Sequence, residues 1–101
     1  MDRNMMKQIE QMQKKMMKAQ EDLANEIVTA TAGGGAVTVE MNGHHEVKSI
    51  KIDPDAVDPE DIEMLEDMVL TAVNEAVEKA RELAGQKMGS ITGGLNIPGL
   101  F

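Results

Sequence analysis

Apolar residues recur at steps of three and four over residues 5–27, which is the spacing of one face of an α-helix. At the helical increment of about 100° per residue they span an arc of only about 80°. No Gly or Pro interrupts the segment. The pattern predicts one helix over residues 2–27. The apolar face of this helix comprises Met5, Ile9, Met12, Met16, Ala19, Leu23 and Ile27.

The following segment changes from helical to alternating periodicity, which is typical of strands. Residues 27–32 are rich in β-branched side chains, and three glycines follow at 33–35. Apolar and polar residues alternate over 36–41 and again over 46–52. Asn42-Gly43 lies between these runs and favours a tight hairpin turn. We predict a three-stranded antiparallel meander.

A second helix is predicted from Pro59 to about Met88. Asp58 suits the N-cap, where its carboxylate accepts from free amides, and Pro59 suits the first helical position. Residues 89–101 contain four Gly and one Pro, and we expect them to form a flexible tail. The apolar face of this helix comprises Ile62, Leu65, Val69, Val73, Ala76, Ala80 and Leu83.

These elements predict an α+β fold with the order α-β-β-β-α, in a single domain over residues 1–88. A helix of about 30 residues is about 45 Å long. A compact domain of about 100 residues has a radius of gyration of only about 13 Å. Both helices should therefore project beyond a three-stranded antiparallel sheet and leave apolar surface exposed in a monomer. We therefore expect a symmetric homodimer in which the two protomers share their sheets and so cover this apolar surface.

The composition excludes several classes of function. Phe101 is the only aromatic residue, and ten Met residues partly replace aromatics as bulky apolar side chains. Proteins that bind single strands, and RNA readers of the four-stranded-sheet type, stack bases on several aromatic rings, and one Phe cannot supply such a surface. The absence of Cys excludes thiolate metal sites and cysteine nucleophiles.

No constellation of side chains predicts catalysis, a metal site or a cofactor. His44 and His45 are adjacent, so in a strand they would point to opposite faces and make a poor chelate. The glycines at 33–35 lack the Lys and Ser/Thr that follow in a phosphate-binding loop. We expect no enzyme activity and no small-molecule substrate. The sequence also shows neither an apolar membrane span nor a secretory leader, so we expect a cytoplasmic protein without a membrane partner.

The negative charge is concentrated in one segment. The chain has a formal net charge of −8, and eight acidic residues without any Lys or Arg lie between Asp53 and Asp67. We call residues 53–67 the acidic window. The remainder of the chain is neutral overall, so the average acidity does not describe every surface that a partner meets.

A basic stripe is predicted on the first helix. On the helical wheel, Lys14, Lys7 and Lys18 lie about 20°, 40° and 60° from Arg3, nearly opposite the apolar face of this helix, with Lys15 further round. Two interpretations fit equally well, namely a solvated helix face and a surface that contacts the backbone of nucleic acid. On the second helix, three glutamates that would repel phosphate lie together, namely Glu75, Glu78 and Glu82.

Several segments resemble a known family, the YbaB/EbfC family of bacterial nucleoid-associated proteins. The resemblance covers essentially the whole chain and is specific in its second half. Its segments are Lys51-Ile52-Asp53-Pro54, Asp58-Pro59-Glu60-Asp61, Glu63-Met64-Leu65-Glu66-Asp67, Ala72-Val73-Asn74-Glu75-Ala76, Thr92-Gly93-Gly94-Leu95 and Pro98-Gly99.

The resemblance implies a tweezer-like homodimer that binds double-stranded DNA and helps to organise the nucleoid, with effects on gene expression. Backbone contacts of this kind have little sequence specificity and weaken with salt. The alternative is an acidic dimeric adaptor that binds a protein partner and not DNA. The charge slightly favours the adaptor, and the resemblance favours DNA binding more strongly. The candidate DNA contacts are Arg3, Lys7, Lys14, Lys15 and Lys18, followed by Lys79, Arg81 and Lys87.

Overall fold

The computed structural model describes residues 2–92 and confirms the predicted α+β order. The three strands pair antiparallel in the order β1-β2-β3. Residues 93–101, most of the predicted flexible tail, lie outside the described residues. The elements are α1 (Arg3–Asn25), β1 (Ile27–Ala32), β2 (Val37–Asn42), β3 (Val47–Ile52), a short 3-10 helix η1 (Pro54–Ala56) and α2 (Ile62–Thr92).

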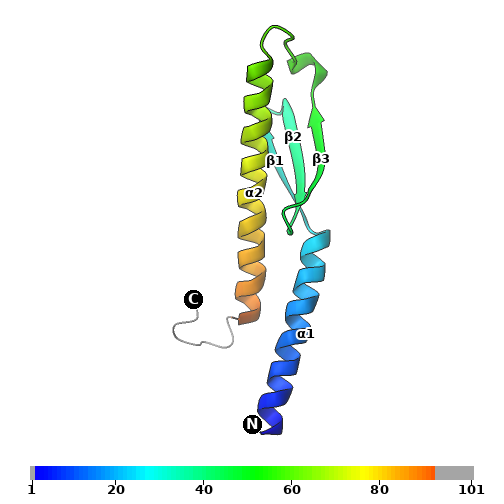
Figure 1. The fold of residues 1–101 in the computed structure, drawn as a ribbon, viewed down its shortest axis with the longest axis vertical. Coiled ribbons are helices and arrows are strands. Elements are labelled where there is room, and N and C mark those ends of the chain that lie inside the picture. Colours follow the sequence, from blue (N-terminus) through cyan, green and yellow to red (C-terminus); the bar gives the residue numbers. More distant parts are fainter. Residues whose placement is uncertain (1, 93–101) are drawn as a thin grey trace.

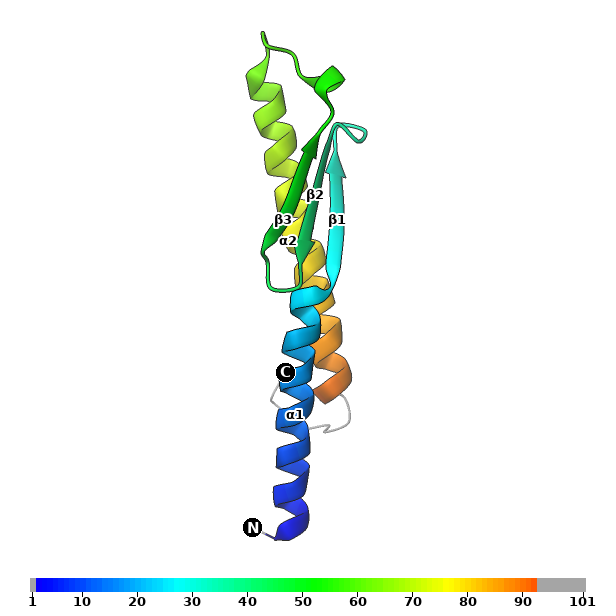
Figure 2. The ribbon, with the colours of Figure 1, turned by 90° about the vertical axis from the view of Figure 1, so that its right-hand side faces the viewer.

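The molecule is elongated because α2 is far longer than the sheet. Its first half lies against the sheet, and its second half runs past the end of the sheet beside α1 (Figures 1 and 2). The principal extents are 69 × 25 × 15 Å, and the radius of gyration is 19.3 Å. This radius exceeds the roughly 13 Å of a compact domain of this length, and the prediction that the helices project beyond the sheet is confirmed.

The core lies between one face of the sheet and one face of α2. Alternate residues of β2 point toward the helix, so Val37 and Val39 are fully buried. The helix presents small side chains at every fourth position, and Ala72, Ala76 and Ala80 are also fully buried. Small residues at this spacing allow the helix axis to approach the sheet closely, so α2 packs chiefly over β1 and β2.

The side chain of Asn42 joins the end of α1 to the β2–β3 hairpin. It is fully buried, and both of its polar atoms are satisfied. Its Nδ2 donates to the Ala24 carbonyl at 3.1 Å and to Glu46 Oε1 at 2.9 Å. Its Oδ1 accepts from the backbone amides of His44 at 2.9 Å and Glu46 at 3.0 Å. One amide side chain thus fixes both the loop and the helix that docks on it.

Gly43 permits the close approach of α1 to this hairpin. Its amide donates to the Leu23 carbonyl at 2.8 Å, and a Cβ at this position would lie 2.8 Å from the same oxygen. The predicted hairpin is confirmed, but its loop has three residues and is closed by a bond from the Asn42 amide to the Glu46 carbonyl at 3.0 Å. His45 adopts the positive φ of 66° that such a loop requires.

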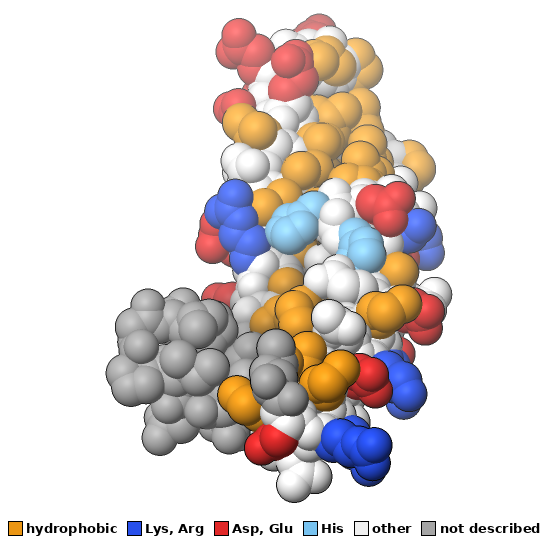
Figure 3. Space-filling view, turned by 60° about the horizontal axis from the view of Figure 1, so that its bottom comes forward, with side chains coloured by type: hydrophobic (Ala, Val, Ile, Leu, Met, Phe, Trp, Pro, Cys, Tyr) orange, Lys and Arg blue, Asp and Glu red, His pale blue; other side chains and the backbone are white. Residues whose placement is uncertain are grey.

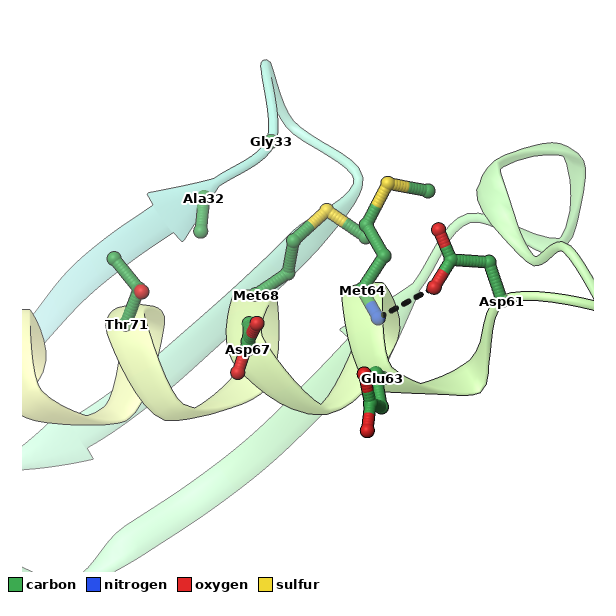
Figure 4. A pocket seen from close by; sticks show the side chains of 8 residues that line it. All are labelled: Ala32, Gly33, Asp61, Glu63, Met64, Asp67, Met68 and Thr71. Carbon is green, nitrogen blue, oxygen red and sulfur yellow. Dashed lines mark hydrogen bonds between the residues drawn. The ribbon is translucent and has the colours of Figure 1, made fainter.

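The predicted start of the second helix is wrong by three residues. The helix begins at Ile62, and its cap is Asp61, whose Oδ1 accepts from the Met64 amide at 3.2 Å (Figure 4). Asp58 instead closes a turn, because its Oδ1 accepts from the Glu60 amide at 2.9 Å. Two Asp side chains in succession therefore accept hydrogen bonds from backbone amides where the sequence suggested a single cap. The first, Asp58, closes a turn, and the second, Asp61, caps the helix.

Two glycines, Gly33 and Gly89, behave differently from what the sequence suggests. Gly33 has a positive φ of 64° and lies directly against Met68 of α2, so a larger residue would displace that side chain (Figure 4). Gly89 does not end α2, which continues to Thr92, past the predicted end at Met88. Ile91 is half-buried, so packing at the end of α2 offsets the cost of about 1 kcal/mol for a helical glycine.

We predict that Asn42→Ala lowers the free energy of unfolding by about 2–3 kcal/mol, because it leaves buried backbone groups of α1 and the hairpin without partners. Urea denaturation followed by circular dichroism measures this change. Ser49→Ala is the matched control, because it removes a single half-exposed bond to Glu40 and should cost less than about 1 kcal/mol. Equal effects of the two variants would contradict the central role of Asn42.

The Asn42 bond also predicts a pH dependence. This hydrogen bond, with smaller contributions from the charges of Lys48 and His44, lowers the pKa of Glu46 below its ordinary value of 4.5. A lowered folded-state pKa adds stability that is present above pH 4.5 and is lost as the pH falls through the folded pKa.

We therefore expect Glu46→Gln to be less stable than the parent chain at pH 7. The difference should shrink as the pH is lowered below 4.5. Paired urea titrations of the two proteins at a series of pH values measure it. A difference that grows toward acid would show that the Glu46 charge destabilises the hairpin.

Candidate nucleic-acid interface

The five cations of α1 lie on the solvent side of the helix. Asp2 starts the helix by accepting from the Met5 amide at 2.8 Å, and no residue of α1 breaks its helical register. We call the apolar face predicted on this helix the α1 seam, and it comprises Met5, Ile9, Met12, Met16, Ala19, Leu23 and Ile27. Of these, Ala19 and Leu23 are buried against the body of the protein. The basic stripe therefore faces outward, as the helical wheel predicted, and all of its members are exposed, namely Arg3, Lys7, Lys14, Lys15 and Lys18.

None of these five cations forms an ion pair within residues 2–92. Glu10 is the only acidic residue between Arg3 and Lys18. The ammonium and guanidinium groups of the stripe therefore remain available to an external anion.

The cations of α2 are placed differently, since each has a partner within the chain. Lys79 donates to the Thr29 carbonyl at 2.7 Å and lies 3.8 Å from Glu75. This contact covers part of the open edge of β1. Arg81 pairs with Glu78 of its own helix at 2.9 Å. The side chains of Lys79 and Arg81 are 45% and 65% exposed, but a carboxylate beside each one weakens its attraction for phosphate.

Lys87 ties the two helices together. Its Nζ lies 2.6 Å from Glu26 Oε1 and 3.8 Å from Asp22 Oδ2, and its side chain is only 22% exposed. The structure thus divides the eight predicted cations into two groups. The five of α1 are exposed and unpaired among the described residues, whereas each of the three of α2 has a partner within the chain.

Gln11 was not among the residues that the sequence indicated. It is exposed and lies on the helical wheel between Lys18 and Lys15, about 80° from Arg3. A neutral amide in this position can donate to a phosphate oxygen, as Asn and Gln side chains do in protein–DNA complexes. Only a wheel that includes polar uncharged residues reveals this position, because Gln11 carries no charge.

The acidic window lies far from the basic stripe. Ile27, just after α1, pairs with Asn42 beside the hairpin, whereas Ile52, just before the window, pairs with Val37 at the other end of the sheet. A six-residue strand, about 20 Å, therefore separates the window from the end of α1. Lys18 lies a further 10 Å or so along the helix.

This separation weakens the repulsion between the acidic window and a ligand on α1. The screening length is about 8 Å at physiological ionic strength, so charges roughly 30 Å apart act almost independently. Figure 3 brings the free end of α1 forward and shows Lys and Arg side chains near that end, with acidic side chains gathered at the far end. The net charge of −8 therefore does not describe the face that α1 presents.

The comparison with known proteins assigns the chain to a family. The sequence model of the YbaB/EbfC DNA-binding family matches residues 1–95. The chain belongs to this family, and the resemblance noted in the sequence is confirmed. The family is defined by DNA binding and is not a class of enzymes.

Individual relatives agree with this assignment. A nucleoid-associated protein of Pelotomaculum thermopropionicum is 58% identical over 97 residues, which cover 96% of this chain and 92% of that one. A nucleoid-associated protein of Alkaliphilus metalliredigens is 56% identical over 98 residues, covering 97% and 86% of the two chains. The crystal structure of the uncharacterized protein HP0035 from Helicobacter pylori superposes with a TM-score of 0.74 at 25% identity, covering 95% and 99% of the two chains.

None of the helices within residues 2–92 is long and apolar enough to cross a membrane.

Proposed function

We propose that this protein is a non-enzymatic, nucleoid-associated protein that binds the backbone of double-stranded DNA through α1. The observation that carries this proposal is the contrast between the two helices. The α1 cations are exposed and unpaired within the described residues, whereas the α2 cations are engaged within the fold. Membership of a DNA-binding family supports the choice of ligand.

The chemistry of the stripe fits phosphate better than bases. Lys and Arg side chains on an open helix face can reach phosphate oxygens, but the face carries no aromatic ring for stacking. From Arg3 to Lys18 the stripe is about 22 Å long, which matches about six phosphates along one strand at roughly 3.4 Å each. Binding through such contacts has little sequence specificity.

We also propose that the functional unit is a homodimer. Ile50 and Ile52 of β3 pair with core residues of β2 and so face the same side of the sheet, yet they are 46% and 39% exposed. They stay open because α2 covers β1 and β2. On α2, Leu70 is 59% exposed, and an open apolar groove between it and β3 is lined by Ile52, Leu65, Glu66, Val69, Leu70 and Val73.

A second copy is the natural cover for this groove. Symmetric pairing would bury the apolar face of β3 on both protomers and leave both α1 helices projecting, as in a pair of tweezers. Two basic stripes on one particle would raise the DNA affinity through simultaneous engagement, which offsets the modest charge of each stripe. The names of the relatives, which are nucleoid-associated proteins, support a role at the nucleoid in the cytoplasm. We propose that this role extends to nucleoid organisation and gene expression.

The DNA-binding proposal predicts the effect of reversing the stripe charge. A Lys7/Lys14/Lys18→Glu variant should lose binding to a random duplex, because it replaces three attractive contacts with repulsive ones. Fluorescence anisotropy at several salt concentrations measures both the affinity and its salt dependence. The slope of log K against log salt should fall by roughly 0.9 for each phosphate contact removed.

The matched control is Lys48/Lys51/Arg81→Glu, which changes the net charge by the same amount at exposed positions outside α1. It should retain most of the affinity. An equal loss of DNA affinity in both variants would show that net charge alone, and not the position of the charges on α1, determines binding. Absence of binding by the parent chain even at low salt would favour the acidic adaptor.

The dimer proposal predicts a separate change in mass. Leu70→Asp should shift the protein from a dimer to an 11.0 kDa monomer in light scattering at micromolar concentration, because it places a charge in the apolar groove. Met17→Asp is the control, since Met17 is 67% exposed on α1 and lies outside the groove. A parent chain that is already monomeric at this concentration would refute the dimer.

A further inference from the structure

The first half of the α1 seam is poorly covered by the described residues, and only Met12 in it is partly buried. Met5 is 54% exposed, Ile9 is 44% exposed and Met16 is 41% exposed, although the same seam is buried at Ala19 and Leu23. Figures 1 and 2 show the reason, since α1 extends past the end of α2. A helical segment of this length without tertiary packing is marginally stable in water.

The end of α2 lies at the point along α1 where the α1 seam changes from buried to exposed. Ser90 and Ile91 line a pocket together with α1 residues from the border between the basic stripe and the α1 seam, namely Lys15, Lys18, Ala19 and Asp22. The two helices run in opposite directions, so a chain that continues beyond Thr92 is directed toward the start of α1 (Figure 1). From Lys15 back to Arg3 the helix is about 18 Å long.

Nine residues follow Thr92 in the sequence, and their reach is sufficient. Fully extended they span at most about 30 Å, which exceeds the uncovered length of α1. They contain no charged side chain. They carry four large apolar side chains that could cover apolar surface on α1, namely Leu95, Ile97, Leu100 and Phe101.

We propose that residues 93–101 pack on the α1 seam of their own chain, over Met5, Ile9, Met12 and Met16. Methionine side chains are flexible and polarizable, so they adapt to an irregular partner and make favourable contacts with an aromatic ring such as Phe101. On the helical wheel the seam lies nearly opposite Arg3, Lys7 and Lys14, so a strap on it supports the helix and leaves these cations free.

A second copy is the competing occupant of the seam. The apolar groove proposed for the dimer lies beside β3, whereas the uncovered seam is at the opposite end of α1. The tail of the same chain is also tethered next to the seam, which gives it a high effective concentration. The family match ends at residue 95, so the last six residues of the strap lie outside it.

Disulfide trapping tests the strap, because the chain contains no Cys of its own. An Ile9→Cys/Ile97→Cys protein should form an intrachain disulfide under mild oxidation, detected by non-reducing electrophoresis and peptide mass spectrometry. The control is Lys7→Cys/Ile97→Cys, which places the helix thiol at nearly the same height on the opposite face. The first pair should oxidise about tenfold faster, in line with the close Cα approach that a disulfide requires.

Equal rates for the two pairs would overturn the proposal, and so would a product that links two chains, which would assign the seam to a second copy. A second measurement does not depend on thiols. Removing residues 93–101 should speed amide hydrogen exchange in residues 5–16 by about tenfold and leave the β-sheet unchanged. Ile97/Leu100/Phe101→Ser in the full chain should do the same. Unchanged exchange in both variants would also overturn the strap.

Discussion

The direction of α1 depends on a small contact in which Asn42 and Gly43 hold the end of the helix against the β2–β3 hairpin. The Asn42 side chain bonds the Ala24 carbonyl, and the Gly43 amide bonds the Leu23 carbonyl. These bonds satisfy two carbonyl groups in the last turn of the helix, which would otherwise lack partners. They also fix the helix so that it leaves the sheet along the long axis of the molecule.

This geometry explains how a chain of net charge −8 can belong to a DNA-binding family. Three residues of the acidic window have local structural roles, since Asp53, Asp58 and Asp61 accept hydrogen bonds from backbone amides around η1 and the start of α2. They lie at the end of the sheet opposite α1. At this distance, screening by salt greatly weakens their electrostatic effect on the basic stripe. Total charge is therefore a poor guide to the ligand, and the position of the charges is a good one.

The elements were predictable because their signals are local. The α1 seam and the alternation in β2 follow directly from the periods of helices and strands. The N-cap of α2 was misplaced because Asp58 and Asp61 are chemically equivalent in sequence, and only the closed turn selects Asp61. The sequence could not predict the role of Gly43 or the ion pair of Lys87 with Glu26, because the partners lie 20 and 61 residues away along the chain.

The most direct test of the account is to map DNA on the protein residue by residue. Amide chemical shifts of the isotope-labelled protein should be recorded with increasing amounts of a random duplex at low salt. We expect changes along α1 over residues 3–18, including Gln11, and none in the acidic window at 53–67. Changes centred on β3 or α2, with α1 unaffected, would contradict the claim that the exposed cations of α1 bind DNA.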